Sequence, residues 1–228
     1  MFVDQYVSSP IAYNATNDQV LYGRLGAEWL FKKLGGRGNV VEMRGIAGVP
    51  ADTDRHRGFV QAKAKYPNIK VVKSVFTGWS YATGGKQMLD ILNSGVQVDG
   101  VWTSGIDYTV VNAFKTAGKP YVPIVGADNA GYVRQMRSLG GTKLPGSAVT
   151  NPSSIGGVGT AVAIRLLEGK SAPKWVKLTP QVWTWPRDSA TINKFVTPGL
   201  SPDASVQLQI RPWTTYTLAQ YKACKALK

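Results

Sequence analysis

Polar and aromatic side chains that could bind a ligand follow short apolar runs at six places in this sequence of 228 residues. They include carboxylates, an amide, hydroxyls, one guanidinium and one indole: Asp4, Gln5, Arg55, Trp79, Ser104, Asp107, Asp128 and Thr150. A carboxylate accepts hydrogen bonds from two neighbouring hydroxyls, and an arginine donates a planar fork. A tryptophan face covers the C–H face of a sugar ring. This mixture predicts a site for a small polyhydroxylated ligand.

Other kinds of site lack the residues that they need. The sequence contains neither of the common Gly-rich phosphate motifs. One cysteine, Cys224, and one histidine, His56, exclude a disulfide framework and a Cys/His zinc site. No nucleophile–base pair accompanies the carboxylates, so we expect no enzyme, no metal and no cofactor. Catalysis on a doubly wound sheet stays the less favoured alternative, which turnover of a candidate sugar would support.

The net charge is strongly positive, with 27 Lys and Arg against 13 Asp and Glu, which gives +14. The basic residues are dispersed, whereas nucleic-acid recognition needs a cluster, so we expect a solvated basic surface and no nucleic-acid partner. No apolar run approaches the ~18 residues of a membrane helix. The first residues have no signal-peptide pattern, so we expect either an abrupt start or the later part of a longer protein.

The hydrophobic pattern alternates between short β-branched runs and longer helical stretches. The predicted strands are Phe2–Val3, Asn39–Met43, Ile69–Phe76, Gly100–Thr103, Val122–Gly126 and Ser147–Val149. The predicted helices are Asn17–Leu34, Asp52–Lys65, Thr83–Leu92, Tyr108–Thr116, Tyr132–Leu139 and Ser154–Leu167. This rhythm of strand and helix predicts an α/β fold with a doubly wound parallel sheet. The strand-end side chains then meet at one edge of that sheet, where ligands bind in such folds.

Two segments carry further structural expectations. The first helix is predicted to have Thr16 and Asn17 as capping residues and to bury one apolar face: Val20, Leu21, Leu25, Trp29 and Leu30. Beyond Lys170, tryptophans and prolines predict an irregular aromatic-rich segment that packs on the α/β body, with one short helix at Ala190–Val196.

Several motifs in order along the chain resemble one known family. They are Asp4-Gln5-Tyr6, Gly45-Ile46-Ala47-Gly48 with Arg55 and Gly58-Phe59 behind it, Thr116-Ala117-Gly118-Lys119, and Val125-Gly126-Ala127-Asp128. Together they resemble the periplasmic monosaccharide-binding proteins of the ribose-binding type, the capture subunits of ABC sugar importers. The resemblance runs from residue 1 to about Leu167. It implies two α/β lobes, joined by three crossing segments, that close over a sugar.

The resemblance also implies roles for single residues. Asp4 falls on an acidic ligand contact, Arg55 on the arginine that clamps ring hydroxyls, and Trp79 on the aromatic that stacks on the sugar. Asp128 takes the place of the aspartate after the last strand of the C-terminal lobe.

Three positions depart from the family. It often has Arg where Gln5 stands, a hinge Gln where Thr150 stands, and Asn-Asp where Ser104-Gly105-Ile106-Asp107 stands. These departures leave the identity of the sugar open. Ser104 and Asp107 are also suited to capping the helix that follows them.

Members of this family carry about a hundred further residues before the strand that precedes Asp4. The resemblance therefore predicts one complete lobe and a partial second one. We expect residues 1–14 to end the N-terminal lobe, 15–149 to form the C-terminal lobe, 150–185 to hold the hinge and remaining N-terminal-lobe elements, and 186–228 to form the aromatic-rich segment. The helix Ser154–Leu167 is then expected to lack its sheet partner.

These observations favour a periplasmic, monomeric solute receptor that binds a monosaccharide or polyol. It would deliver this ligand to the membrane permease of an ABC-type importer. The alternative is the ligand-sensing domain of a lactose-repressor-type transcription regulator, which has the same sensor fold. That alternative needs a helix-turn-helix ahead of the sensor, and this sequence contains none.

Overall fold

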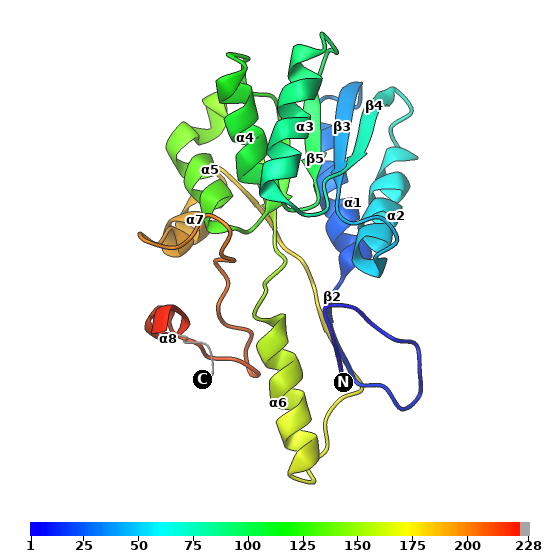
Figure 1. Ribbon diagram of the computed structural model, residues 1–228, viewed down its shortest axis with the longest axis vertical. Coiled ribbons are helices and arrows are strands. Elements are labelled where there is room, and N and C mark those ends of the chain that lie inside the picture. The colour runs from blue at the N-terminus through cyan, green and yellow to red at the C-terminus, as the bar shows by residue number, and fades with distance from the viewer. Residues whose placement is uncertain (224–228) are drawn as a thin grey trace.

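The structure is a computed structural model that describes residues 1–223 and contains two sheets (Figure 1). The larger sheet has six strands in the order β4-β3-β5-β6-β7-β9. They are β3 (Gly38–Arg44), β4 (Ile69–Phe76), β5 (Gly100–Thr103), β6 (Ile124–Ala127), β7 (Gly146–Val149) and β9 (Val182–Thr184). All pairs are parallel except β7–β9. The parallel strands coincide with the predicted ones to within two residues at each end.

Helices cover both faces of this sheet (Figure 1). They are α1 (Gln19–Lys33), α2 (Pro50–Lys63), α3 (Tyr81–Asn93), α4 (Asp107–Thr116) and α5 (Ala130–Lys143). Neighbouring strand residues such as Val40 and Val41 alternate between two buried cores, because successive side chains point to opposite faces. One core contains residues of α1 and α2, and the other those of α3, α4 and α5. The predicted doubly wound α/β sheet is therefore confirmed.

The beginning of α1 and its buried face differ from the prediction. Asn14–Asn17 forms the buried strand β2, and α1 begins at Gln19 with Asp18 as its N-cap, whose Oδ1 accepts from Leu21 N at 3.0 Å. The buried residues of α1 include Tyr22, Gly23, Gly26, Ala27, Leu30 and Phe31, whereas the predicted face is buried only at Leu30.

Glycines explain why α1 buries a different face from the predicted one, because they let the backbones of α1 and α2 come into contact. A Cβ on Gly23 would lie 1.9 Å from the carbonyl oxygen of Arg55. A Cβ on Gly58 would lie 2.0 Å from the carbonyl oxygen of Val20. Glycines therefore determine which face of α1 contacts α2, and a pattern of hydrophobic residues does not reveal this face.

The smaller sheet contains three parallel strands in the order β1-β2-β8, with β1 at Phe2–Val3 and β8 at Trp175–Leu178. Helix α6 (Ile155–Leu167) packs on it through Val158 and Val162, which are fully buried. The expectation that this helix lacks a sheet partner is wrong. Its other face remains open, since Leu167 is 88% exposed.

The later part of the chain is more regular than predicted. Strand β9 extends the large sheet, so residues 182–184 do not belong with the elements of the small sheet. Two helices follow, α7 (Ser189–Phe195), close to the predicted one, and α8 (Leu218–Ala223). Cys224 lies outside the described residues. Among the helices of residues 1–223, none has the length and apolar character needed to span a bilayer.

Three segments connect the two sheets: β2 to α1, β7 to α6, and β8 to β9 (Figure 1). Hydrogen bonds join these segments. Asp18 N donates to Leu178 O at 2.9 Å, and Thr150 N donates to Gln181 O at 2.9 Å. The first crossing therefore lies at Asn17–Asp18, because β2 continues past residue 14.

Candidate functional site

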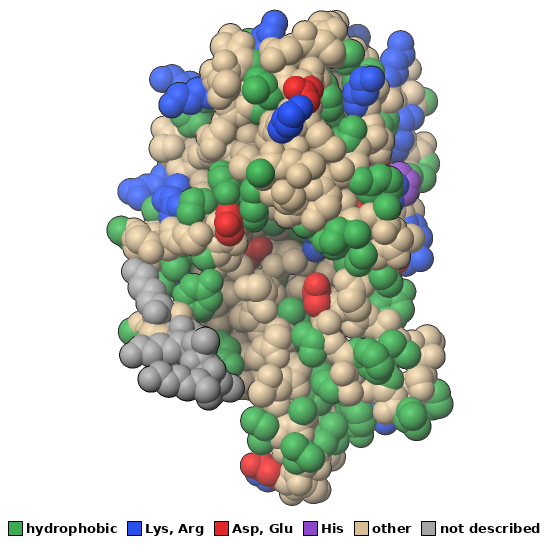
Figure 2. Space-filling model, in the orientation of Figure 1, with side chains coloured by type: hydrophobic (Ala, Val, Ile, Leu, Met, Phe, Trp, Pro, Cys, Tyr) green, Lys and Arg blue, Asp and Glu red, His purple; other side chains and the backbone are tan. Residues whose placement is uncertain are grey.

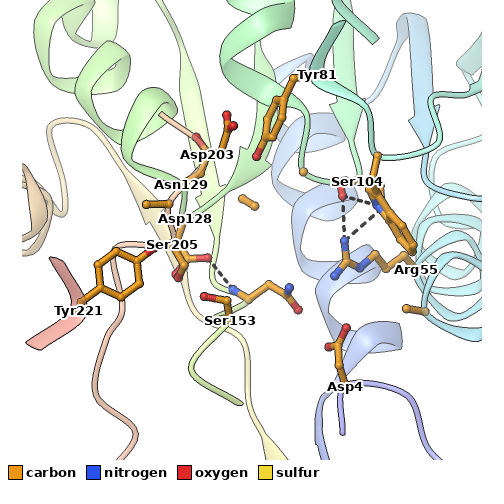
Figure 3. Close-up of a pocket in the computed structure, with 16 residues that line it drawn as sticks. Asp4, Arg55, Tyr81, Ser104, Asp128, Asn129, Ser153, Asp203, Ser205 and Tyr221 are labelled. Carbon is orange, nitrogen blue, oxygen red and sulfur yellow. Dashed lines mark hydrogen bonds between the residues drawn. The ribbon is translucent and has the colours of Figure 1, made fainter. Parts of the chain in front are cut away.

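A cavity of about 310 Å³ lies between the two sheets, at the carboxyl ends of the parallel strands. Figure 2 shows the molecule hollowed between its broad upper part and its narrower lower part, and Figure 3 shows the lining residues. Five of the eight predicted residues line this cavity: Asp4, Arg55, Trp79, Ser104 and Asp128. They come from five separate segments, and only the fold brings them together.

Arg55, in the second turn of α2, is the buried cation of the site. Its Nη1 donates to Ser104 O at 2.8 Å (Figure 3). Its Nε donates to Gln19 Oε1 at 2.7 Å. The guanidinium lies over the ring of Tyr22, 4.3 Å from its centroid. No carboxylate among residues 1–223 forms a salt bridge with it. Because a buried charge is normally paired, this arginine is suited to a ligand that accepts its hydrogen bonds.

Trp79 follows β4 in a tight turn and has a positive φ of 52°, which is uncommon for a residue with a bulky side chain. Its Nε1 donates to Ser104 O at 2.9 Å, which fixes the ring at the edge of the cavity. A Cβ on Gly45 would lie 2.2 Å from this ring, so only glycine at that position leaves room for the indole. The fold thus holds an aromatic ring beside Arg55, whose guanidinium carbon lies 5.7 Å from the ring centroid.

Asp4 also has a positive φ, 63°, and lies just after β1. Its backbone is fixed by Asp4 N donating to Ala15 O at 2.9 Å. Gln19 Nε2 donates to Asp4 Oδ1 at 3.3 Å and to Asn151 Oδ1 at 3.3 Å. Gln19 therefore links Asp4 after β1, Arg55 of α2 and Asn151 in the crossing from β7 to α6.

Gln19 is a positioning residue that sequence reasoning did not identify. It follows the end of β2 by two residues. The run Asn14–Asn17 has one apolar residue and therefore no strand pattern in the sequence, although it forms β2. The position of Gln19 just after that strand is the only sequence feature that points to it.

Asp128, just after β6, presents a carboxylate that is almost wholly buried. Its Oδ1 accepts from Asn151 N at 2.7 Å, and its Oδ2 accepts from Ser205 Oγ at 3.4 Å. Burial raises the pKa of Asp128 to about 6, although the hydrogen bonds and the charge of Arg55 act in the opposite direction. Asp128 is therefore easier to protonate than an exposed aspartate.

Asp107 does not line the cavity, although it was predicted to do so. It is fully buried at the start of α4, where it accepts from Ala127 N at 2.5 Å, Tyr108 N at 2.8 Å and Asn129 Nδ2 at 2.5 Å. Burial raises the pKa of Asp107 to about 7. Its role is to hold the loop between β6 and α5 behind the cavity wall.

Gln5 and Thr150 also lie outside the cavity lining. Gln5 Oε1 accepts from Ala51 N at 3.2 Å, near the beginning of α2. Thr150 Oγ1 accepts from Gln181 N at 2.8 Å, which joins two crossing segments. Thr150 therefore belongs to the connection between the sheets, where the family has its hinge residue.

Other lining residues were not predicted as ligand contacts. Tyr81, Asn129, Asn151 and Ser153 each lie within three residues of a predicted one, so the strand-end positions gave a signal for them. Asp203, Ser205 and Tyr221 come from the aromatic-rich segment, and no motif pointed to them.

The cavity offers hydrogen-bond acceptors above all. Carboxylates of Asp4, Asp128 and Asp203 line it, against the single guanidinium of Arg55. Asn and Ser side chains add groups that both donate and accept. No group of three His, Cys, Asp or Glu side chains within residues 1–223 is arranged to hold a metal ion. The arrangement can bind a ring with many hydroxyl groups.

Comparisons with known proteins lead to one family. Residues 1–171 match the model of the periplasmic binding protein domain. A xylitol-binding protein of Mycolicibacterium smegmatis is 31% identical over 163 residues, which are 70% of this chain and 46% of that protein. The ribose import binding protein of Salmonella typhimurium is 29% identical over 168 residues, 73% of this chain and 56% of that protein. The chain thus spans about half the length of the curated relatives it matches.

Solved structures lead to the same family. An ABC transporter solute-binding protein of Thermobispora bispora has a TM-score of 0.76 at 26% identity, covering 89% of this chain and 61% of that one. The binding protein of the arabinose ABC transporter of Shewanella sp. ANA-3, with bound L-arabinofuranose, has a TM-score of 0.71 at 27% identity, covering 80% and 62%. None of these matches supports the repressor alternative. The chain belongs to the family of periplasmic binding proteins.

Proposed function

We propose that this chain binds a neutral monosaccharide or polyol in the cavity between its two sheets. The observation that carries the proposal is the meeting of three features around one space of about 310 Å³. They are the buried guanidinium of Arg55, the fixed ring of Trp79, and the carboxylates of Asp4 and Asp128. In this proposal Trp79 covers a ring face, Arg55 donates to ring or hydroxyl oxygens, and the carboxylates accept from hydroxyls.

The charges around the cavity favour a neutral ligand over an anionic one. Three carboxylates face one guanidinium, so a sugar acid or sugar phosphate would place like charges within a poorly solvated space. The net charge of +14 lies elsewhere on the molecule, since Arg55 is the only Lys or Arg among the cavity-lining residues that the structure describes. An acceptor-rich cavity is suited to bind the hydroxyl groups of a neutral ligand.

The biological role that fits this ligand class is solute capture for import. Relatives are described as xylitol-binding and ribose import binding proteins. We propose that the present protein acts in the periplasm as a monomer and passes its ligand to the permease of an ABC-type importer, with no catalytic step. The large sheet with its helices would act as the complete lobe, and the small sheet with α6 as the partial one.

Calorimetric titration of the chain with pentoses, hexoses, polyols, a sugar acid and a sugar phosphate tests the ligand class. We expect saturable binding of at least one neutral member. The anionic members should bind more than tenfold more weakly than their neutral counterparts, because one like-charge contact costs on the order of 1–3 kcal/mol. Equal or tighter binding of the anions, or no binding by any member, would contradict the proposal.

The raised pKa of Asp128 predicts how binding depends on pH. Hydroxyl donors favour the ionised carboxylate, which is present above the pKa of about 6 and lost as the pH falls below it. If only the ionised form binds, the affinity should fall about tenfold between pH 7.5 and pH 5. Titrations across this range measure the effect. The Asp128→Asn variant is the control and should bind more weakly at pH 7.5 but with little pH dependence; an unchanged dependence would rule out Asp128 as the titrating contact.

A further inference from the structure

A segment beyond the family domain forms part of the cavity wall. The match to the periplasmic binding protein domain ends at residue 171, yet Asp203, Ala204 and Ser205 line the cavity together with Asp4 and Arg55. Figure 3 shows Asp203 and Ser205 across the cavity from Arg55. The family domain therefore does not by itself define the shape of this site.

The wall segment, residues 200–206, is hydrogen-bonded through its backbone to Asp128, which follows β6, and to the start of α5. Its hydrogen bonds are Ala130 N to Ala204 O at 2.8 Å, Gly131 N to Pro202 O at 2.9 Å and Val206 N to Asp128 O at 3.0 Å. Leu200, Ala204 and Val206 are buried in the core on the side of α3, α4 and α5. A segment with its backbone bonded and its apolar side chains buried has a fixed position, so its polar side chains face the cavity in a defined way.

Gly131 allows this close approach, because a Cβ there would lie 2.9 Å from the ring of Tyr108 and 3.0 Å from Pro202. Asp203 is held from the same side. Its Oδ1 accepts from Tyr108 Oη at 2.6 Å, and the ring of Tyr108 packs against Tyr81, with centroids 4.7 Å apart. No hydrogen bond joins Asp203 Oδ2 to any other residue within 1–223, so this oxygen can accept from a ligand.

We propose that Asp203 and Ser205 determine which hydroxyl pattern the cavity accepts. This inference rests on the proposed sugar-binding function. Arg55 and Trp79 hold one side of the ligand, and the wall segment contacts the hydroxyl on the opposite side. Asp203 accepts from that hydroxyl through its free oxygen, while Ser205 fixes the neighbouring carboxylate of Asp128. Asp203 is exposed when no ligand is bound. A ligand that displaces the water from this carboxylate without offering a hydroxyl leaves it unpaired, so such a ligand should bind more weakly.

The test compares the best ligand with its monodeoxy analogues, on the unaltered chain and on the Asp203→Asn and Ser205→Ala variants. Asparagine keeps an acceptor for Tyr108 Oη, so this variant should fold like the unaltered chain, which its thermal unfolding checks. We expect Asp203→Asn to lower the affinity for the parent sugar at least tenfold. The affinity for one deoxy analogue should stay within about twofold of its value in the unaltered chain, so that discrimination at that single hydroxyl is lost. The control is Asp90→Asn, an exposed aspartate of α3 that pairs with Lys86 and lies outside the cavity lining.

The outcomes separate this inference from the function on which it rests. Binding by the unaltered chain, with the same ranking of deoxy analogues in both wall variants, overturns the inference and leaves sugar binding intact. Loss of discrimination at one hydroxyl in Asp203→Asn but not in Asp90→Asn supports it. No binding by the unaltered chain overturns both.

Discussion

Replacing Arg55 with lysine should weaken binding of the preferred sugar about tenfold to a hundredfold, and replacement with alanine should weaken it further. Arg55 lies buried between Gln19, Ser104 and the ring of Tyr22. Lysine keeps the charge but loses the planar fork, so the bonds to Gln19 and Ser104 cannot be made together with bonds to a ligand. A hydrogen bond to a charged group contributes about 1.5–3 kcal/mol, which corresponds to this range of affinity.

Arg57→Ala is the matched control. Arg57 is on the same helix, its side chain is 55% exposed, and it pairs with Asp54 outside the cavity lining. We expect its affinity to stay within about twofold of the unaltered chain, because exposed ion pairs contribute little. Titration calorimetry on all three variants, with thermal unfolding as a check of the fold, measures the difference. Binding by Arg55→Lys as tight as by Arg57→Ala would remove Arg55 from the ligand contacts.

The parallel strands of the large sheet were predictable because they are short β-branched runs that alternate with helices, whereas the antiparallel edge strand β9 was not predicted. Strand β5, Gly100–Thr103, has the predicted bounds. Strand β2 was not predictable in the same way. Its sequence, Asn-Ala-Thr-Asn, has one apolar residue, and it is buried because β1, β8 and α6 surround it. Its burial is a property of the tertiary structure, which overrides local propensity.

The site was predictable to the extent that strand ends define it. Trp79 and Asp128 were found because a doubly wound sheet brings the ends of β4 and β6 to one edge. Asp107 follows the same rule, but its carboxylate turns toward the backbone of Ala127 instead of the cavity. The direction of a side chain at a strand end depends on which donors are nearest, and the order of residues along the chain does not give that.

The position of the wall segment could not be predicted from the sequence. Asp203 is 95 residues from Tyr108, its hydrogen-bond partner. The wall segment lies beside the cavity because Leu200, Ala204 and Val206 pack into the core. Short apolar residues between prolines and glycines give no periodic signal for such a position.

The second large effect concerns stability. Gly23→Ala and Gly58→Ala should each lower the free energy of unfolding by about 2–4 kcal/mol, at or above the usual range for overpacking. The added methyl group would meet backbone atoms of the facing helix, 1.9 Å from Arg55 O for Gly23 and 2.0 Å from Val20 O for Gly58. A backbone atom cannot rotate away as a side chain can, so α1 and α2 must separate. For a chain of this size, that corresponds to a lowering of the melting temperature by about 5–15 °C.

Gly156→Ala is the matched control, because it also lies in a helix, α6, but a Cβ there meets no atom within 4 Å. Alanine is the better helix former by up to about 1 kcal/mol, so this variant should be equally or slightly more stable. Thermal unfolding of the three variants compares them directly. Because the obstructed atom is the carbonyl of Arg55, Gly23→Ala should also displace that side chain and weaken sugar binding, whereas Gly156→Ala should not. Equal melting temperatures for Gly23→Ala and Gly156→Ala would show that α1 and α2 are not in backbone contact, and the placement of Arg55 over Tyr22 would lose its support.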